Sequence, residues 1–183
     1  MVTMGIDPSI NCTGVCINTD NKYIYIMITS KMTKKLKSFK HDNIYIKDYN
    51  KCDTKGLDYE QKEICKVENM RQICDILQDL VKQYSPDMVY MEGISYGSVG
   101  SAALSDLAGL NFMIRYMLRI NNIPFYIVSP MSLKKFAVAN GSASKELMVF
   151  AWKNAEPLLN NVRDIKVDDL ADAYFLSNYS QKC

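Results

Sequence analysis

The first thirty residues alternate between apolar runs and short polar breaks, a pattern typical of β-strands. Apolar residues dominate positions 2–7 and 14–18, and Tyr and Ile alternate over positions 23–28. The link at positions 8–14 contains Pro, Ser, Asn and Gly, which favour a turn. The pattern therefore predicts that the chain opens with an antiparallel meander of three strands.

From residue 58 onward the apolar positions follow a helical period. Over residues 58–84 they recur at steps of three and four, which predicts an amphipathic helix that Ser85 and Pro86 stop. The later elements are predicted as a strand at 87–92, a glycine-containing loop at 93–100, a helix at 102–121, a strand at 124–128, a short helix opening at Pro130, a helix capped by Ser142 or Ser144 and running to 152, and a helix at 167–179. This order predicts an α/β fold with a mixed five-stranded sheet flanked by helices, forming one domain over residues 1–183.

The pattern lapses between residues 31 and 56, and lysines dominate its first part. Lys31, Lys34, Lys35, Lys37 and Lys40 occur without an acidic residue among them. A run of like charges is usually a solvated loop, but it also suits contact with nucleic acid. Both interpretations remain open for this stretch.

Composition narrows the chemistry more than the fold. The 183 residues are 48% hydrophobic and 23% charged, with a formal net charge of +2, as in ordinary globular proteins. No apolar run reaches membrane-spanning length, so we expect an intracellular, cytoplasmic protein, or one of the host-cell cytoplasm if the source is a phage or virus. The six cysteines form no Cys-x-x-Cys pair and are interpreted as reduced, mostly buried thiols. A single histidine, His41, excludes a histidine-rich zinc centre and leaves carboxylates as the expected catalytic groups.

Four acidic residues lie where apolar elements end or begin. Asp7 closes the first predicted strand and Glu92 closes the strand at 87–92. Asp169 and Asp172 lie three positions apart in the last helix and therefore share one face. Carboxylates gathered in this way repel one another unless cations lie among them, and two Mg²⁺ ions about 4 Å apart can hydrolyse a phosphodiester.

Each acid also has a purely structural explanation. Asp7 lies at a predicted turn, and Asp169 and Asp172 would stabilise the start of a helix. Glu92 is harder to explain in this way because four apolar residues precede it. Asp168 is interpreted as the helix cap rather than as a ligand. The conjunction of the four carries the hypothesis further than any one of them.

The order of these motifs resembles the RuvC family of Holliday-junction resolvases, within the RNase H-like superfamily. The resemblance covers residues 4–178 and rests on Gly-Ile-Asp-Pro at 5–8, Thr-Gly at 13–14, the acid at 92, Ser-Pro at 129–130, Asn-Gly-Ser-Ala-Ser-Lys at 140–145 and Asp-Leu-Ala-Asp-Ala at 169–173. The segment at 140–145 is similar to the family's Gly-x-Gly-x-Ala-x-Lys motif. Ser9, where the family commonly has Gly, is similar to phage and mobile-element members and suggests a phage or viral type.

The resemblance implies a function and a set of site residues. The catalytic and metal-binding acids would be Asp7, Glu92, Asp169 and Asp172, holding two Mg²⁺ ions, or Mn²⁺ ions, per site. Lys134 and Lys145 match the family's phosphate-binding basic residues, although either also fits an ordinary surface lysine. The implied activity is metal-dependent hydrolysis of four-way DNA junctions by paired cuts.

The loop after Glu92 lacks the aromatic residue that many bacterial members carry close behind this acid. Tyr96 is the nearest candidate for stacking on a DNA base. Three alternatives therefore stay open: a branched-DNA nuclease that also cuts flaps and forks, another RNase H-like nuclease, and a junction-binding protein with an idle metal site.

Paired cuts in a two-fold symmetric junction imply a homodimer. The helix at 102–121 carries Met113, Met117 and Leu118 beside Tyr116. This apolar side suits either a dimer face or the intramolecular core.

Overall fold

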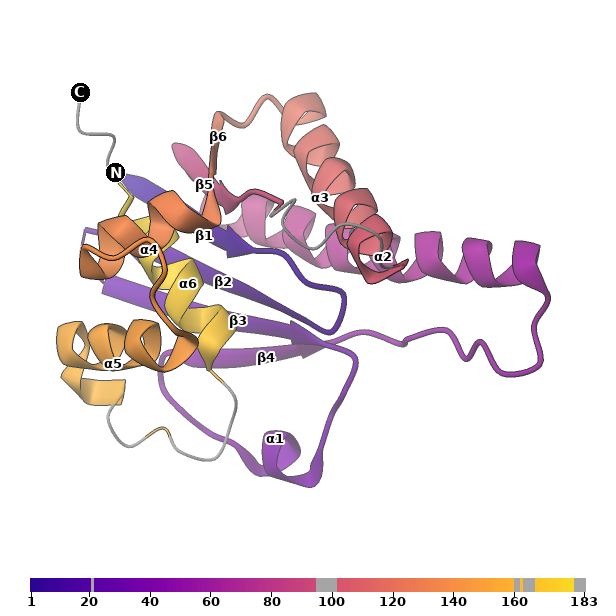
Figure 1. The fold of residues 1–183 in the computed structure, drawn as a ribbon, viewed down its shortest axis with the longest axis horizontal. Coiled ribbons are helices and arrows are strands. Elements are labelled where there is room, and N and C mark those ends of the chain that lie inside the picture. The colour runs from indigo at the N-terminus through magenta and orange to yellow at the C-terminus, as the bar shows by residue number, and fades with distance from the viewer. Residues whose placement is uncertain (21, 95–101, 160–161, 163–166, 180–183) are drawn as a thin grey trace.

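A computed structural model of the chain describes every residue except 21, 95–101, 160–161, 163–166 and 180–183 (Figure 1). A mixed sheet with the strand order β4-β3-β2-β1-β5-β6 forms its centre. The strands are β1 (Val2–Asp7), β2 (Cys12–Thr19), β3 (Lys22–Thr29), β4 (Ile44–Asp48), β5 (Met88–Glu92) and β6 (Phe125–Val128). The predicted meander is confirmed, because β1, β2 and β3 pair antiparallel, whereas β4, β5 and β6 each pair parallel to a neighbour.

The sheet has six strands, so the prediction of five was wrong. The additional strand, β4, lies at the sheet edge and pairs only with β3 along the described chain. Its sequence, Ile-Tyr-Ile-Lys-Asp, has one buried residue, Ile44. An exposed edge strand needs little apolar sequence, so its pattern is too short to predict it from hydrophobicity. The short helix α1 (Lys34–Ser38) also lies in the stretch where no element was predicted.

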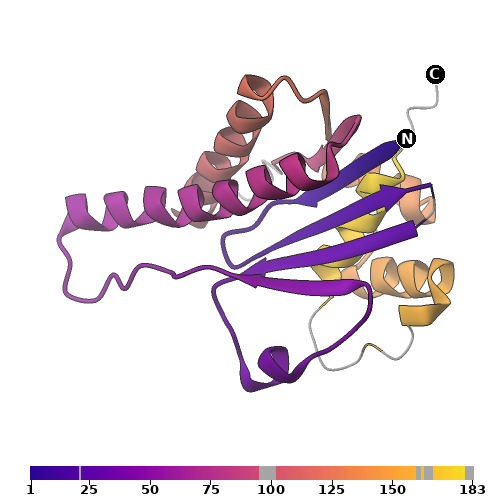
Figure 2. The same cartoon turned by 180° about the vertical axis from the view of Figure 1, so that it is seen from behind.

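Helices cover both faces of the sheet (Figures 1 and 2). One face carries α2 (Tyr59–Tyr84) and α3 (Ala102–Ile120), and the other carries α4 (Pro130–Val138), α5 (Lys145–Ala155), the 3₁₀ turn η1 (Pro157–Leu159) and α6 (Asp168–Ser177). Helix starts follow the expected capping chemistry. Asp58 caps α2 in a capping box with Gln61, and Ser144, rather than Ser142, caps α5.

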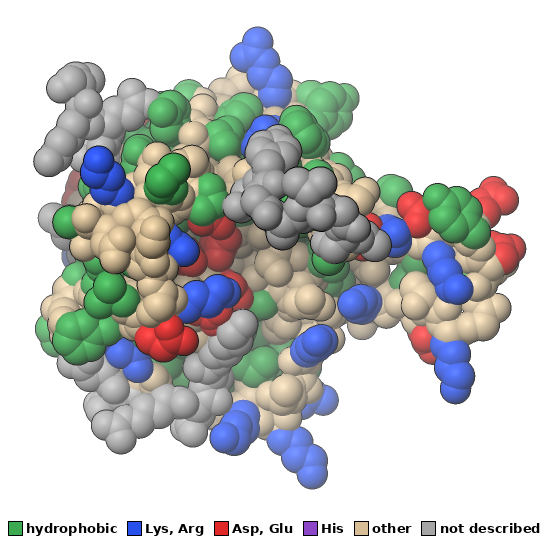
Figure 3. All heavy atoms as spheres, viewed as in Figure 1, with side chains coloured by type: hydrophobic (Ala, Val, Ile, Leu, Met, Phe, Trp, Pro, Cys, Tyr) green, Lys and Arg blue, Asp and Glu red, His purple; other side chains and the backbone are tan. Residues whose placement is uncertain are grey.

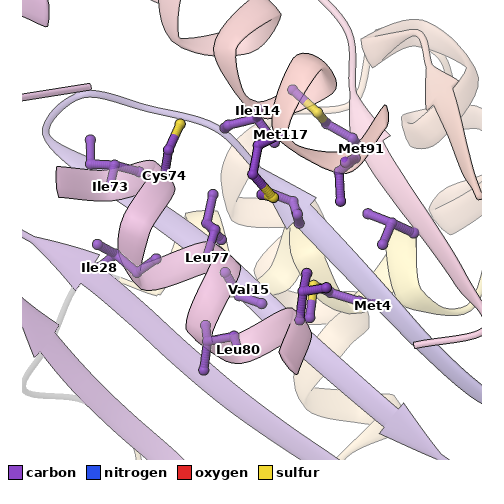
Figure 4. Packing of buried hydrophobic residues seen from close by; sticks show 14 of the residues in the cluster. Met4, Val15, Ile28, Ile73, Cys74, Leu77, Leu80, Met91, Ile114 and Met117 are labelled. Carbon is purple, nitrogen blue, oxygen red and sulfur yellow. The ribbon is translucent and has the colours of Figure 1, made fainter. Parts of the chain in front are cut away.

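The core on the α2–α3 side fixes both helices against the sheet. Figure 4 shows Ile73, Leu77 and Leu80 of α2 lying over Val15 and other apolar residues of the strands. The predicted apolar side of α3 belongs to this same cluster, because Met117 and Leu118 are buried in it and Met113 packs against it. The core interpretation therefore holds for these three residues, whereas Tyr116 is 68% exposed.

The core on the opposite face lies beneath α5 and α6. Trp152 is fully buried, and its indole Nε1 donates a hydrogen bond of 3.2 Å to the hydroxyl of Tyr25 in β3. Five cysteines lie in the described chain and all are free thiols, three of them buried, as predicted. Across the described residues, no helix combines the length and apolarity needed to span a bilayer.

Candidate active site

Asp7 and Glu92 are neighbours because they end adjacent parallel strands. Ile6 of β1 pairs with Met91 of β5, so the following residue on each strand projects at the same edge of the sheet. The two carboxyl groups interact by a hydrogen bond, and each shifts the pKa of the other. The carboxyl ends of parallel strands commonly form ligand sites, and these two acids lie at such an edge.

Helix α6 brings the other two acids to this edge by resting directly on the backbone of β1 and β2. A Cβ atom at Gly14 would lie 2.1 Å from the carbonyl oxygen of Asp169. One at Gly5 would lie 2.0 Å from the carbonyl oxygen of Ala173. Gly14 is also the strand partner of Asp7. Two glycines therefore allow the close approach that places α6 beside the ends of the strands.

The four carboxylates feel one another's charge. Burial raises the pKa of Asp7 well above its ordinary value, and the charges of Glu92, Asp172 and Asp169 raise it further. Burial and the charge of Glu92 raise the pKa of Asp172 to about 7. Burial also raises the pKa of Glu92, although two lysines oppose this shift. The site thus concentrates negative charge where the side chains are largely shielded from water.

The donor set suits hard divalent cations. Oδ1 of Asp172 is buried and has no hydrogen-bond partner in the described part of the chain. Carboxylate oxygens without histidine or cysteine are the ligands that Mg²⁺ and Mn²⁺ prefer. Among the described residues, however, no three His, Cys, Asp or Glu side chains form a completed metal-ion group. The acids therefore converge without closing to coordination distances, and their role as ligands stays a prediction.

The two predicted phosphate-binding lysines lie on the same side of the sheet as α6. Lys134 is in α4 and Lys145 is the first residue of α5, and the positive charges of both favour the ionised form of Glu92. Figure 3 shows acidic side chains gathered near the middle of this face with basic side chains beside them. Both lysines thus act electrostatically on the cluster, although DNA binding by them stays a prediction.

Asp168 has a different role from the predicted helix cap. The N-cap residue of α6 is Val167, which makes no side-chain capping bond. Oδ2 of Asp168 instead accepts a hydrogen bond of 2.7 Å from Nζ of Lys145, and this contact raises the pKa of Lys145. The interpretation of Asp168 as a cap was wrong, because an ion pair with a neighbouring helix orients its carboxylate.

Asn111 is a site-supporting residue that the sequence did not indicate. Its side chain is 1% exposed, and its Nδ2 donates a 3.0 Å hydrogen bond to the backbone carbonyl oxygen of Glu92. A lone polar residue on the apolar side of the predicted helix was the available signal. Tyr96, the predicted stacking residue, lies outside the described residues.

Comparisons with known proteins bear on the fold. At the level of sequence, no protein-family model and no curated protein matches the chain. Among solved structures, the chain is similar to Thermus thermophilus RuvC, with a TM-score of 0.56 and 17% identity over 97% of this chain and 91% of that chain. The structure of T. thermophilus RuvC with a Holliday junction substrate matches with a TM-score of 0.61 and 15% identity, over 97% and 90% of the two chains. The yeast mitochondrial Holliday junction resolvase Ydc2 matches with a TM-score of 0.53 and 19% identity, over 96% and 75%.

Likeness at these identities concerns the fold, and it extends over nearly the whole chain. The match includes the central sheet and the helices on its two faces, as expected for the RNase H-like architecture. The chain therefore has the fold of the RuvC-type Holliday junction resolvases, as its motifs predicted.

Proposed function

We propose that this protein is a metal-dependent endonuclease that resolves four-way DNA junctions by paired phosphodiester hydrolysis. The observation that carries the proposal is the approach of α6 to Gly5 and Gly14. This contact brings Asp169 and Asp172 to the edge where Asp7 and Glu92 end their strands. A binding protein gains nothing from this arrangement, because concentrated negative charge beside DNA phosphates weakens binding.

The four carboxylates fit a pair of Mg²⁺ or Mn²⁺ ions. Asp7 would be shared between the two ions, Glu92 and Asp172 would complete their ligand sets, and Asp169 would bind one ion or orient the attacking water. When bound, such ions generate the nucleophile at neutral pH and stabilise the charge on the leaving oxygen. The raised pKa values of Asp7 and Asp172 reflect repulsion that nearby positive charge would relieve.

The lysines supply binding energy for the substrate. In this proposal Lys134 and Lys145 contact phosphates that flank the cleaved bond, as point charges without sequence preference. Their positive charges also keep Glu92 ionised and ready to bind a cation. The similar T. thermophilus RuvC was solved with a Holliday junction substrate, which supports a junction as the substrate here.

We further propose that the protein acts as a homodimer, because paired cuts in a two-fold symmetric junction need two sites. Phe112, Tyr116 and Ile120 line the outer side of α3 at steps of four residues and are 57%, 68% and 57% exposed. This outer stripe is the candidate contact between two copies. Light scattering should give a dimer for the wild type and a monomer for Tyr116→Glu, whereas Tyr59→Glu, at another exposed tyrosine on α2, should leave the dimer intact.

The decisive experiment compares substrates under one set of conditions. Labelled four-way junction, flap, fork, linear duplex and RNA–DNA hybrid would be incubated with Mg²⁺ and either wild type or Asp7→Asn. Symmetric paired nicks in the junction alone, lost in the variant, are the expected result. Cleavage of flaps and forks would broaden the substrate, and cleavage of the hybrid would indicate another RNase H-like nuclease. Junction binding without any cleavage would overturn the enzymatic proposal.

A further inference from the structure

The lysine-rich stretch at residues 31–41 folds into a defined lobe. Thr33 caps α1, and its hydroxyl accepts a hydrogen bond of 3.3 Å from the backbone nitrogen of Leu36. Leu36 and Phe39 are partly buried against the core beneath α5 and α6. These contacts anchor one side of the stretch to the domain. We call residues 31–41 the basic lobe.

The anchored side of the basic lobe leaves its lysines facing solvent. All five lysines of the lobe are exposed: Lys31, Lys34, Lys35, Lys37 and Lys40. None of them takes part in an ion pair within the described chain. The nearest acidic residue after the lobe in sequence is Asp42, and residues 31–41 contain none. The molecule therefore presents a concentrated positive charge that nothing in the described chain neutralises.

The basic lobe begins at the same end of the sheet as the carboxylates. It follows β3, whose last residue, Thr29, pairs with Cys12 and donates a hydrogen bond of 3.0 Å to the carbonyl oxygen of Asn11. Residues 8–11 connect Asp7 to β2 at this end. Figures 1 and 3 show α1 and a group of basic side chains below the central acidic side chains, on one face of the molecule.

We infer that the basic lobe binds the sugar–phosphate backbone of one DNA arm, away from the bond that is cut. The inference rests on the proposed function and adds a second contact region to the substrate. Exposed lysines bind phosphates without reading the base sequence, and each contact releases counterions from the DNA. A rigid lobe offset from the carboxylates suits a branched substrate, because an arm leaving the branch point can lie along it.

Charge-neutral variants provide the test. The lobe variant carries Lys34→Gln, Lys35→Gln and Lys37→Gln. A matched control carries Lys22→Gln, Lys82→Gln and Arg119→Gln, which removes three exposed positive charges from the opposite end of the sheet. Dissociation constants for a four-way junction would be measured in EDTA, which prevents cleavage, between 50 and 200 mM salt. Thermal unfolding would verify that both variants fold.

The lobe variant is expected to bind about ten-fold or more weakly, and the slope of log K against log salt should fall by about 3, near 0.9 per phosphate contact. The control should bind within about two-fold of the wild type with an unchanged slope. Arginine at the same three lobe positions should restore both quantities. A lobe variant that behaves like the control would overturn the inference.

Cleavage separates this inference from the proposed function. At saturating protein and with Mg²⁺, the lobe variant should still cut the junction at the wild-type positions, because its carboxylates are untouched. A wild type that cuts junctions, combined with a lobe variant of unchanged affinity, would refute the basic lobe alone. A wild type that binds no branched DNA would refute both.

Discussion

The ammonium group of Lys145 lies 2.7 Å from Oδ2 of Asp168, and this pair joins the first residue of α5 to the first residue of α6. The Asp168 side chain is 8% exposed, whereas that of Lys145 is 62% exposed. One end of the pair is therefore held inside the fold while the other reaches solvent. The contact ties a predicted phosphate-binding lysine to the residue immediately before Asp169.

Breaking this pair is expected to affect stability more than an ordinary surface ion pair would. Lys145→Gln removes the cation from a buried carboxylate, so it should lower the free energy of unfolding by about 2 kcal/mol, between the values for exposed and buried pairs. Urea unfolding of Lys145→Gln, Asp168→Asn and the double variant measures the coupling, expected near 1 kcal/mol. Strictly additive effects of the two substitutions would contradict this expectation.

The two close glycine contacts should tolerate no side chain. Gly14→Ala would place its Cβ 2.1 Å from the carbonyl oxygen of Asp169, so α6 must shift. We expect a loss of about 3 kcal/mol in unfolding free energy and a large loss of Mg²⁺-dependent cleavage. Gly109→Ala is the control, because its Cβ meets only the flexible end of Met70 at 3.2 Å and alanine favours a helix. It should stay within about 1 kcal/mol of the wild type.

Stability without metal should fall as pH rises. The pKa of Asp172 is raised from its ordinary 3.8 to about 7, so between these values the folded protein keeps a proton that the unfolded chain releases. Asp7 and Glu92 shift in the same direction. In EDTA, the unfolding free energy at pH 8 should be lower than at pH 5 by on the order of 3 kcal/mol.

Two comparisons check the origin of this pH dependence. Asp172→Asn should flatten it and raise the metal-free stability at pH 8, because the substitution removes a repelling charge. Added Mg²⁺ should raise the melting temperature of the wild type at pH 8 and have less effect on Asp172→Asn. A wild type that is more stable at pH 8 than at pH 5 in EDTA would show that the carboxylates do not repel one another as described.

Asn111 is expected to act by positioning Glu92. Asn111→Ala removes the hydrogen bond to the carbonyl oxygen of Glu92, which should lower the unfolding free energy by about 1 to 2 kcal/mol. Because the end of β5 loses a support, kcat for junction cleavage should fall while KM changes little. Asn121→Ala, which removes a side-chain hydrogen bond to the carbonyl oxygen of Met117 at the far end of α3, should leave kcat unchanged.

The elements that the sequence predicted are those with a long apolar period or a clear cap. The helix predicted from residue 58 begins at Tyr59 because Asp58 is its cap. Strand β4 and helix α1 have no such signal. The strand pairs at an edge with one buried residue, and the packing of Leu36 and Phe39 against distant residues holds the lobe that contains the helix. Hydrophobic pattern alone does not contain that tertiary information.

The candidate site divides in a similar way. Asp7 and Glu92 stood out because each ends an apolar run, and the structure places them on adjacent strands. The ion pair of Asp168 with Lys145 links residues 23 positions apart, and the bond from Asn111 to Glu92 spans 19 positions. Neither spacing corresponds to a helical or strand period, so only the fold brings these partners together.

The dependence of the site on α6 also has a consequence during synthesis. Asp7 is made early, but Asp169 and Asp172 emerge more than 160 residues later. A nascent or truncated chain that ends before α6 has two of the four acids and lacks the helix that covers Gly5 and Gly14. Such a fragment has no complete set of acids, so an unfinished chain would not cut the DNA of the cell that makes it.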